Sequence, residues 1–386
     1  MNRNEFDDIR PYTDAEAAEA LGRIARHPLL PLISKYLFPD RPASALRRML
    51  SGVQSVAQFQ SGVMFSVVQA ILAKTSAGFT CSGMEHLKAL EGKCFLAVSN
   101  HRDIVLDPAL VQYALYSAGL PCTEICVGSN LVTARLTEDI MRSNRMIKVI
   151  RGIPARELYL SSQRLSAFIR GQIVSGTASV WIAQREGRTK DGRDATEQGL
   201  LKMFDMSGGG TFGENFRELN IVPLSISYEY ESCDALKARE VLLRRRGPYV
   251  KKKNEDLRSI LTGIRQPKGH IHLEIGAPLT AEEIAAAAQE KKNDRYQALC
   301  RILDRRILGG YRLWKTHYMA HDLLHGKTEF LDAGRYDAAD LAAFEHYVAA
   351  KVARTGRCAD RQELRRIFLE IYAGPVEALV TQFILC

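Results

Sequence analysis

The sequence has little that would indicate a secreted or membrane-spanning protein. Its eight cysteines include no Cys-x-x-Cys pair and are too few, in 386 residues, for a disulfide scaffold. The first residues lack the basic start and apolar run of a secretory signal, and no run reaches the roughly 18 consecutive apolar residues of a membrane-spanning helix. We therefore expect reduced thiols in the cytoplasm and, where the protein meets a bilayer, a peripheral position on its inner face.

Acidic side chains are also in the minority. Lys and Arg outnumber Asp and Glu by 53 to 44, which gives a formal net charge of +9 and favours an anionic partner. The basic run Arg244–Lys253 is expected to be a loop, either simply solvated or docking anionic lipid or an acidic acyl carrier protein. Its only aromatic residue is Tyr249 and no nucleic-acid recognition signature accompanies it, so we expect no nucleic-acid binding.

Hydrophobic patterning divides the chain into three parts. Residues 1–80 are expected to be helical, because apolar residues between Leu46 and Leu72 recur three or four apart. A long helix or helical hairpin fits, packed on its own domain or touching lipid. From residue 281 to 386 the pattern is again helical, and Thr280-Ala-Glu-Glu is a capping-box signature at its start.

The middle part, residues 81–280, alternates short apolar runs with helical patterns. This alternation predicts an α/β domain with a central mixed sheet covered by helices. The Gly-rich segment Ser207–Gly210 is expected to be a loop. Five strands are predicted: Cys94–Ser99, Ile147–Ile150, Ala178–Ala183, Ile221–Tyr228 and His270–Ile275.

The first of these strands leads into polar residues, and Asp107-Pro108 then begins a helix. His101 therefore lies in a strand-to-helix loop, where an imidazole could take a proton from an attacking alcohol if a carboxylate held its second nitrogen. Asp107 is the candidate for that carboxylate. The same Asp-Pro pair is also typical of a helix N-terminus, so Asp107 could cap the helix as well.

Four segments resemble the motifs of the glycerolipid acyltransferase family, the glycerol-3-phosphate and 1-acyl-glycerol-3-phosphate acyltransferases. The family's first motif, Asn-His-Arg-Ser-x-x-Asp-Pro, is similar to Asn100–Pro108. Here five residues instead of four separate His101 from Asp107, and Asp103 stands in the Ser position. Either Asp107 reaches His101 through a looser turn, or Asp103 replaces it.

The other three motifs are also recognisable. Ile147–Gly152 resembles the strand whose arginine, here Arg151, grips the acceptor phosphate. Val180–Gly192 resembles the strand and Pro-Glu-Gly-Thr-Arg-Ser segment, with Arg185 in place of the proline. In this segment the resemblance implies substrate-binding roles for Glu186, Gly187, Arg188 and Thr189. Ile221–Ile226 resembles the family's strand with a proline near its start, and Pro223 is expected to shape the acyl-chain pocket.

The resemblance implies an enzyme that moves a fatty acyl group to a hydroxyl of a glycerol-phosphate-type acceptor in phospholipid biosynthesis. Acyl-CoA or acyl carrier protein would serve as co-substrate, without another cofactor. His317, His321 and His325 share one face of an expected helix, but no Cys or Glu pattern completes a site, and no metal is assigned. The alternatives are an acyltransferase for an amino-acid-containing lyso-lipid, a hydrolase, and a lipid-binding protein of the same fold without activity.

Overall fold

The computed structural model describes residues 5–132, 134–355 and 360–384, and it has the predicted α/β architecture with a mixed sheet. The seven strands lie in the order β1-β7-β6-β2-β5-β3-β4. Strands β2 to β6 are mutually parallel, whereas β7 runs antiparallel to β6. The bounds are β1 Ser76–Ser82, β2 Leu96–Ser99, β3 Glu124–Gly128, β4 Met146–Val149, β5 Val180–Ala183, β6 Ile221–Tyr228 and β7 Gly269–Ile275. The carboxyl ends of five strands therefore share one edge of the sheet.

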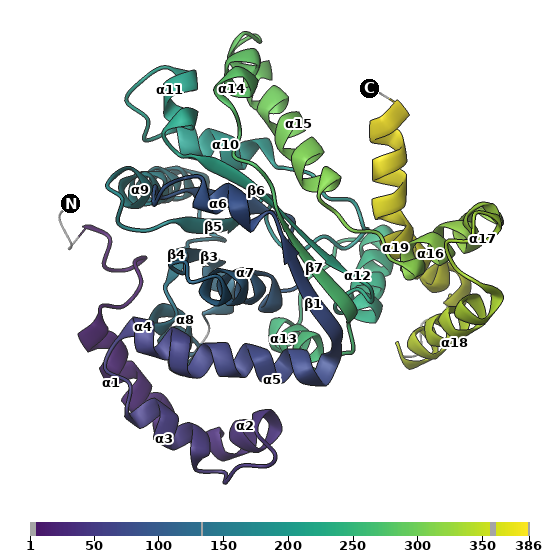
Figure 1. The fold of residues 1–386 in the computed structure, drawn as a ribbon, viewed down its shortest axis with the longest axis horizontal. Helices are drawn as coiled ribbons and strands as arrows, with labels where there is room; N and C mark the ends of the chain where they lie inside the picture. The colour runs from purple at the N-terminus through teal and green to yellow at the C-terminus, as the bar shows by residue number, and fades with distance from the viewer. Residues whose placement is uncertain (1–4, 133, 356–359, 385–386) are drawn as a thin grey trace.

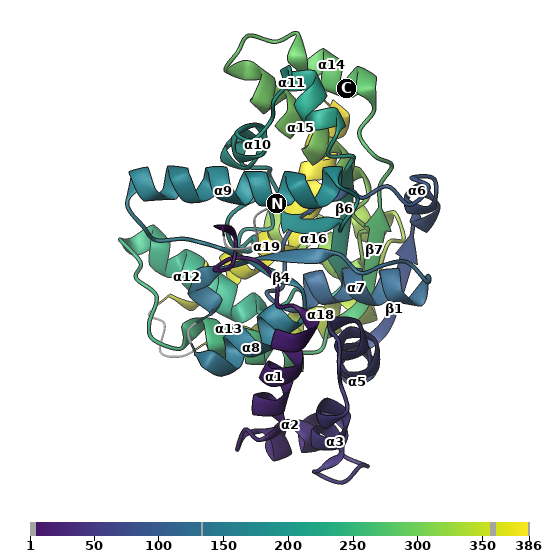
Figure 2. The same ribbon diagram turned by 90° about the vertical axis from the view of Figure 1, so that its left-hand side faces the viewer.

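Helices cover both faces of the sheet, as Figures 1 and 2 show. Side chains of β2 alternate between the two cores: Ala97 packs with the N-terminal helices, while Leu96 and Val98 pack with the helices of the opposite face. The first face carries α1 Asp14–Ala25, α2 Leu30–Leu37, α3 Ala45–Ser51, α4 Val56–Gln58, the π-helical η2 Phe59–Met64, α5 Phe65–Thr75 and α7 Leu106–Ser117. The second carries α9 Ala155–Val174, α10 Gln198–Asp205, α11 Phe212–Arg217, α14 Ala281–Ala288 and α15 Asp294–Gly309.

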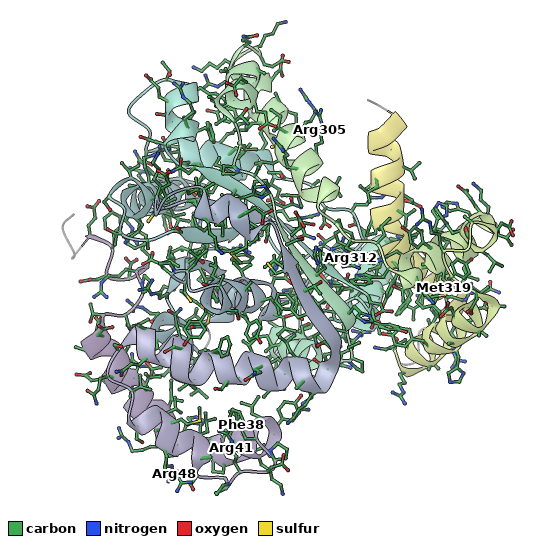
Figure 3. The ribbon with its side chains drawn as sticks, viewed as in Figure 1. Phe38, Arg41, Arg48, Arg305, Arg312 and Met319 are labelled. Carbon is green, nitrogen blue, oxygen red and sulfur yellow. The ribbon has the colours of Figure 1, made fainter. Side chains whose placement is uncertain are left out.

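The remaining helices lie at the edges and toward the C-terminus. Their bounds are α6 Met84–Lys88, η3 Ser129–Leu131, α8 Arg135–Ser143, α12 Asp234–Arg246, α13 Glu255–Arg265, α16 Lys315–His325, α17 Glu329–Asp332, α18 Ala338–Arg354 and α19 Arg361–Ile384. A third core joins α12 to α16, α18 and α19, and it contains Met319 (Figure 3). The C-terminal helices thus extend the domain from one side of the sheet (Figure 1).

The N-terminal part is helical as predicted, up to its last residues. From Val56 to Thr75 the helical segments run on continuously, and this stretch is long and apolar enough to cross a membrane, with a mean hydropathy of 1.4. Length and composition alone are weak evidence of a span. One side of the stretch, including Phe59, Val63 and Ile71, is buried in the core of the domain, as expected for a helix that packs on its own sheet.

Two strands differ from the prediction. Strand β1 occupies Ser76–Ser82, so the first part is not helical to residue 80, and it pairs in parallel with β7 at the edge of the sheet. Strand β3, Glu124–Gly128, was not predicted either. The five strands that were predicted all exist, within two residues of the expected bounds.

The basic run Arg244–Lys253 is only partly the loop that was predicted. Arg244, Arg245 and Arg246 form the last turn of α12, where cations interact favourably with the helix carbonyls. The structure confirms the Gly-rich loop between α10 and α11 and the capping box at Thr280 and Glu283.

Candidate active site

His101 lies where β2 ends and its imidazole is held by Asp107. The His101 Nδ1 and Asp107 Oδ2 atoms are 2.8 Å apart, and the Asp107 side chain is fully buried. An ionised carboxylate can only accept hydrogen bonds, so Nδ1 carries the hydrogen and Nε2 keeps a lone pair. The side chain of His101 is 15% exposed and lines a cleft. The imidazole is therefore held in one orientation at the lining of the cleft.

The loop between His101 and Asp107 wraps around the carboxylate. Asp107 Oδ2 accepts hydrogen bonds from the backbone amides of Arg102, at 2.5 Å, and Asp103, at 2.8 Å. Its Oδ1 accepts a hydrogen bond from the Tyr228 hydroxyl at 2.7 Å. Together with Nδ1–H of His101, four hydrogen-bond donors therefore surround the Asp107 carboxylate. The extra residue in the first motif is accommodated by this turn.

Asp103 does not replace Asp107 as the partner of His101. Its Oδ1 accepts hydrogen bonds from the amides of Val105 and Leu106, both at 2.8 Å, at the start of α7. Burial favours the neutral acid, but the Leu106 and Val105 amides, the Ser232 hydroxyl and the charge of Arg188 together lower the pKa of Asp103 below its usual value. The capping role that the sequence suggested for Asp107 thus belongs to Asp103.

The cleft beside His101 combines an apolar floor with a cationic wall. It has a volume of about 280 Å³ and opens at the edge where β2, β5, β3 and β4 end. Trp181 and Leu165 belong to its apolar lining, and the Trp181 ring lies edge-on to His101 with centroids 6.0 Å apart. In open parallel sheets, ligands bind in the crevice at the carboxyl ends of the strands. This cleft occupies that position.

Arginines on the loops after β4 and β5 face this cleft. Arg151 pairs with Glu186, with Nη1 and Oε1 3.2 Å apart. Gly187 has a φ of 71°, a left-handed conformation that glycine adopts without strain, and it turns the chain between Glu186 and Arg188. These four predicted residues are all brought together with His101.

Two guanidinium groups in the cleft have unused donors. Arg185 Nε and Arg188 Nη1 are buried atoms without a hydrogen-bond partner among the described residues, and neither side chain forms an ion pair there. Because both side chains line the cleft without an ion pair among the described residues, their positive charges are suited to an anionic ligand. Arg185, which stands where the family motif has proline, was not predicted to bind substrate.

Thr189 lies differently from what the resemblance implied. It is fully buried, its hydroxyl donates to Asp194 at 2.5 Å, and it is not among the residues that line the cleft. Its backbone amide donates to the His101 carbonyl at 2.8 Å. Thr189 therefore joins the arginine loop to the His101 loop instead of donating to a phosphate. Pro223 is likewise buried within β6 and does not line this cleft.

Sequence reasoning missed the buried ionic network behind His101. Arg102 is 1% exposed, and its guanidinium reaches Asp194 at 2.5 Å and Glu231 at 3.3 Å. Lys237 donates to the Arg102 carbonyl at 2.8 Å and also pairs with Glu231. The partners of Arg102 are 92 and 129 residues away along the chain, so no local pattern could have paired them.

A covalent mechanism through the cleft's cysteine has no support. Cys126 lines the cleft, but burial, with the charge of Glu124, raises the pKa of its thiol well above the usual range, and the thiolate is the reactive form. Within the described residues no group of three or more His, Cys, Asp or Glu side chains is arranged to hold a metal ion.

Comparisons with known proteins do not identify a family. A scan against protein-family profiles finds no match to this chain, and a search of curated proteins finds none either.

Proposed function

We propose that this protein is an O-acyltransferase of the glycerolipid type, with His101 as its general base. The observation that carries the proposal is the pairing of His101 with Asp107 in a cleft that Arg185 and Arg188 line without an ion pair among the described residues. A base and anion-binding groups in one cleft suit an acceptor that carries a hydroxyl and a phosphate.

The proposed reaction needs no enzyme-bound intermediate. His101 Nε2 takes the proton of the acceptor hydroxyl as its oxygen attacks the thioester carbonyl. The new C–O bond forms, the C–S bond breaks, and the proton is returned to the thiolate that leaves. A positioned base of this kind typically contributes about 10² to 10⁴ in rate, and holding both substrates in one cleft supplies much of the rest.

The arginines would hold the acceptor while the apolar floor receives its acyl chain. A guanidinium fork can bind phosphate oxygens in pairs, which fixes orientation better than an ammonium group. Since Arg151 is already engaged by Glu186, Arg185 and Arg188 are the first candidates for the phosphate. In this proposal Arg151 and Glu186 position that loop and the acceptor.

An anionic membrane surface is the proposed source of the acceptor, with the protein peripheral on the cytoplasmic side. Support comes from the first turns of α9, where Leu158 lines the cleft and is 42% exposed. Tyr159 and Leu160 beside it are 56% and 55% exposed. Apolar side chains at the cleft mouth are suited to meet the acyl region of a bilayer.

The test is to offer the purified protein acyl-CoA or acyl carrier protein as donor with a panel of acceptors, and to identify the lipid product by mass spectrometry. We expect the ester of lysophosphatidic acid or glycerol-3-phosphate and its loss by at least about 100-fold in His101→Ala. His346→Ala, at an exposed position of α18, is the control. Turnover of the His101→Ala variant at the wild-type rate would refute the base, and thioester loss without added acceptor would indicate a hydrolase.

A further inference from the structure

A second concave surface, separate from the cleft that contains His101, lies between α13 and α18. It has a volume of about 770 Å³ and is more open than the cleft. The walls come from α13, from the segment that follows it and from the last turns of α18. We call this surface the α13/α18 groove. No residue of the groove lines the cleft that contains His101.

The groove is cationic, and among the described residues no Asp or Glu lines it. Its four cations are Arg258, Arg265, Lys351 and Arg354. Within the described part of the chain, the exposed Arg258 and Arg354 side chains have no hydrogen bond or ion pair. Arg265 rests over the Tyr36 ring, 5.4 Å from its centroid, and Lys351 pairs with the buried Asp234. Two cations are thus free for a partner.

The same groove exposes an apolar stripe. Leu257 and Leu261 lie one turn apart on α13 and are 50% and 41% exposed. Residues four apart lie on one face of a helix, so both leucines face the groove together with Pro267 and Ala350. An apolar stripe between cations is the complement of an amphipathic helix with acidic edges.

The groove is physically connected to the active site through α13. Asp256, in the first turn of that helix, lines the His101 cleft, whereas Leu257 and Arg258 line the groove. Farther along, α13 packs so closely on the His101 loop that a Cβ built on Gly263 would lie 2.3 Å from Asp103 Oδ2. A partner seated in the groove would therefore lie beside the mouth of the cleft.

The basic run that the sequence singled out is a weaker docking surface. Arg244 pairs with Glu240, and Arg245 pairs with Glu370. Lys251 pairs with Asp256 at 2.6 Å. Of the six cations in the run, only Lys252 and Lys253 lack a carboxylate partner among the described residues, and the run contributes no exposed leucine beside them.

We propose that the α13/α18 groove docks an acidic amphipathic helix of the carrier protein that delivers the acyl thioester. Helices bind such grooves with their apolar face, and carboxylates at the edges steer the encounter toward the cations. The surface is concave, so a helix matches its shape better than a flat bilayer does. The identity of this partner as the acyl donor rests on the function proposed above.

The test compares two donors in Arg258→Glu/Arg354→Glu. The control is Arg26→Glu/Arg48→Glu, which makes the same charge change at exposed positions in the N-terminal helical segment; Figure 3 shows Arg48 at the lower edge of the molecule. We expect the KM for an acyl carrier protein donor to rise at least tenfold in the groove variant, with kcat/KM for acyl-CoA within twofold of wild type. The control variant should leave both unchanged.

Direct binding separates this inference from the proposed reaction. The Kd of the unacylated carrier protein, measured by titration calorimetry, should weaken at least tenfold in the groove variant alone, whether or not any acyl group is transferred. An equal loss with both donors, or an unchanged carrier Kd, would overturn the inference. So would a groove variant that loses binding to anionic vesicles or RNA while it keeps the carrier.

Discussion

Asp107 serves both the imidazole and the loop that contains it. Its Oδ2 meets Nδ1 of His101 and the amides of Arg102 and Asp103, so one carboxylate fixes the ring and the backbone on which the ring stands. At this scale the sequence was informative, because His101 and Asp107 belong to one short segment. It left open which aspartate is the partner, since a choice between residues four apart depends on how the turn closes.

The matched variants Asp107→Asn and Asp103→Asn test this arrangement. An asparagine at 107 presents an NH₂ group to donors and no longer fixes the imidazole tautomer, so we expect kcat to fall by about 10² to 10⁴. Asparagine at 103 keeps an oxygen for the α7 amides, and kcat should stay within about threefold. Steady-state kinetics with both variants is the measurement. Similar losses in the two would mean that the pairing with His101 has no special role.

The ion-pair partners of Arg102 could not be predicted from the sequence. Arg102 adjoins the predicted base, yet its own side chain points away from the cleft to Asp194 and Glu231. Ion pairs between segments that are far apart in the sequence produce no local periodic pattern from which they could be predicted. Because Arg102 is almost fully buried, the folded state needs the carboxylates of Asp194 and Glu231 as its partners. A buried guanidinium without such partners would destabilise the fold by several kcal/mol.

Among the elements, the long apolar strand β6 was predictable, whereas the short strand β3 and the exposed edge strand β1 were not. β6 is buried at all eight positions and is the predicted Ile221–Tyr228. β1, with the sequence Ser-Ala-Gly-Phe-Thr-Cys-Ser, lies at the edge of the sheet with no buried position. Such a strand is held by its pairing with β7, which only the tertiary fold supplies.

Helix α16 contains a buried histidine that should make stability depend on pH. Burial, and then the charge of Arg102, lower the pKa of His317 from 6.5 to about 3. Between these values the unfolded chain binds one more proton than the folded chain. The contribution of this neutral imidazole is complete above pH 6.5 and is lost as pH falls toward 3, by about 1.4 kcal/mol per pH unit.

The variant His317→Gln removes this titration while it keeps an acceptor for the Trp314 amide, which donates to Nδ1 at 2.8 Å. Urea unfolding between pH 4 and 6 should show a slope of the unfolding free energy that is smaller by about 1.4 kcal/mol per pH unit than in wild type. An unchanged slope in His317→Gln would contradict the assignment.

Over the whole molecule, hydrogen bonds and ion pairs connect the C-terminal helices to the proposed active site. Tyr372 of α19 accepts a hydrogen bond from the Glu231 amide at 3.0 Å, and its hydroxyl donates to Asp234 at the same distance. Glu231 in turn pairs with Arg102, which adjoins the proposed base His101. The sequence indicated only a helical extension, because contacts of this kind join residues more than 100 positions apart.

One close approach between these parts is at Gly192, on the loop that follows Arg188. A Cβ at this position would lie 2.3 Å from the Ile371 carbonyl oxygen of α19, whereas a Cβ at Gly176 would meet no atom within 4 Å. The φ angles are 77° and 70°, so both glycines adopt the left-handed conformation. In a regular helix the Ile371 carbonyl would accept a hydrogen bond from the amide of residue 375, but Pro375 has no amide hydrogen. The loop that contains Gly192 packs against this carbonyl.

Alanine at each glycine separates backbone strain from the contact with α19. Both variants carry the cost of a left-handed alanine, about 1 kcal/mol, but only Gly192→Ala also forces the loop away from the helix. We therefore expect Gly192→Ala to lower the unfolding free energy by at least about 1 kcal/mol more than Gly176→Ala. Because the displaced loop carries Arg188, acyl transfer should fall with it, while Gly176→Ala retains wild-type turnover. Equal stability and equal turnover in the two variants would show that the helix does not support the arginine loop, and the C-terminal segment would then be independent of the chemistry.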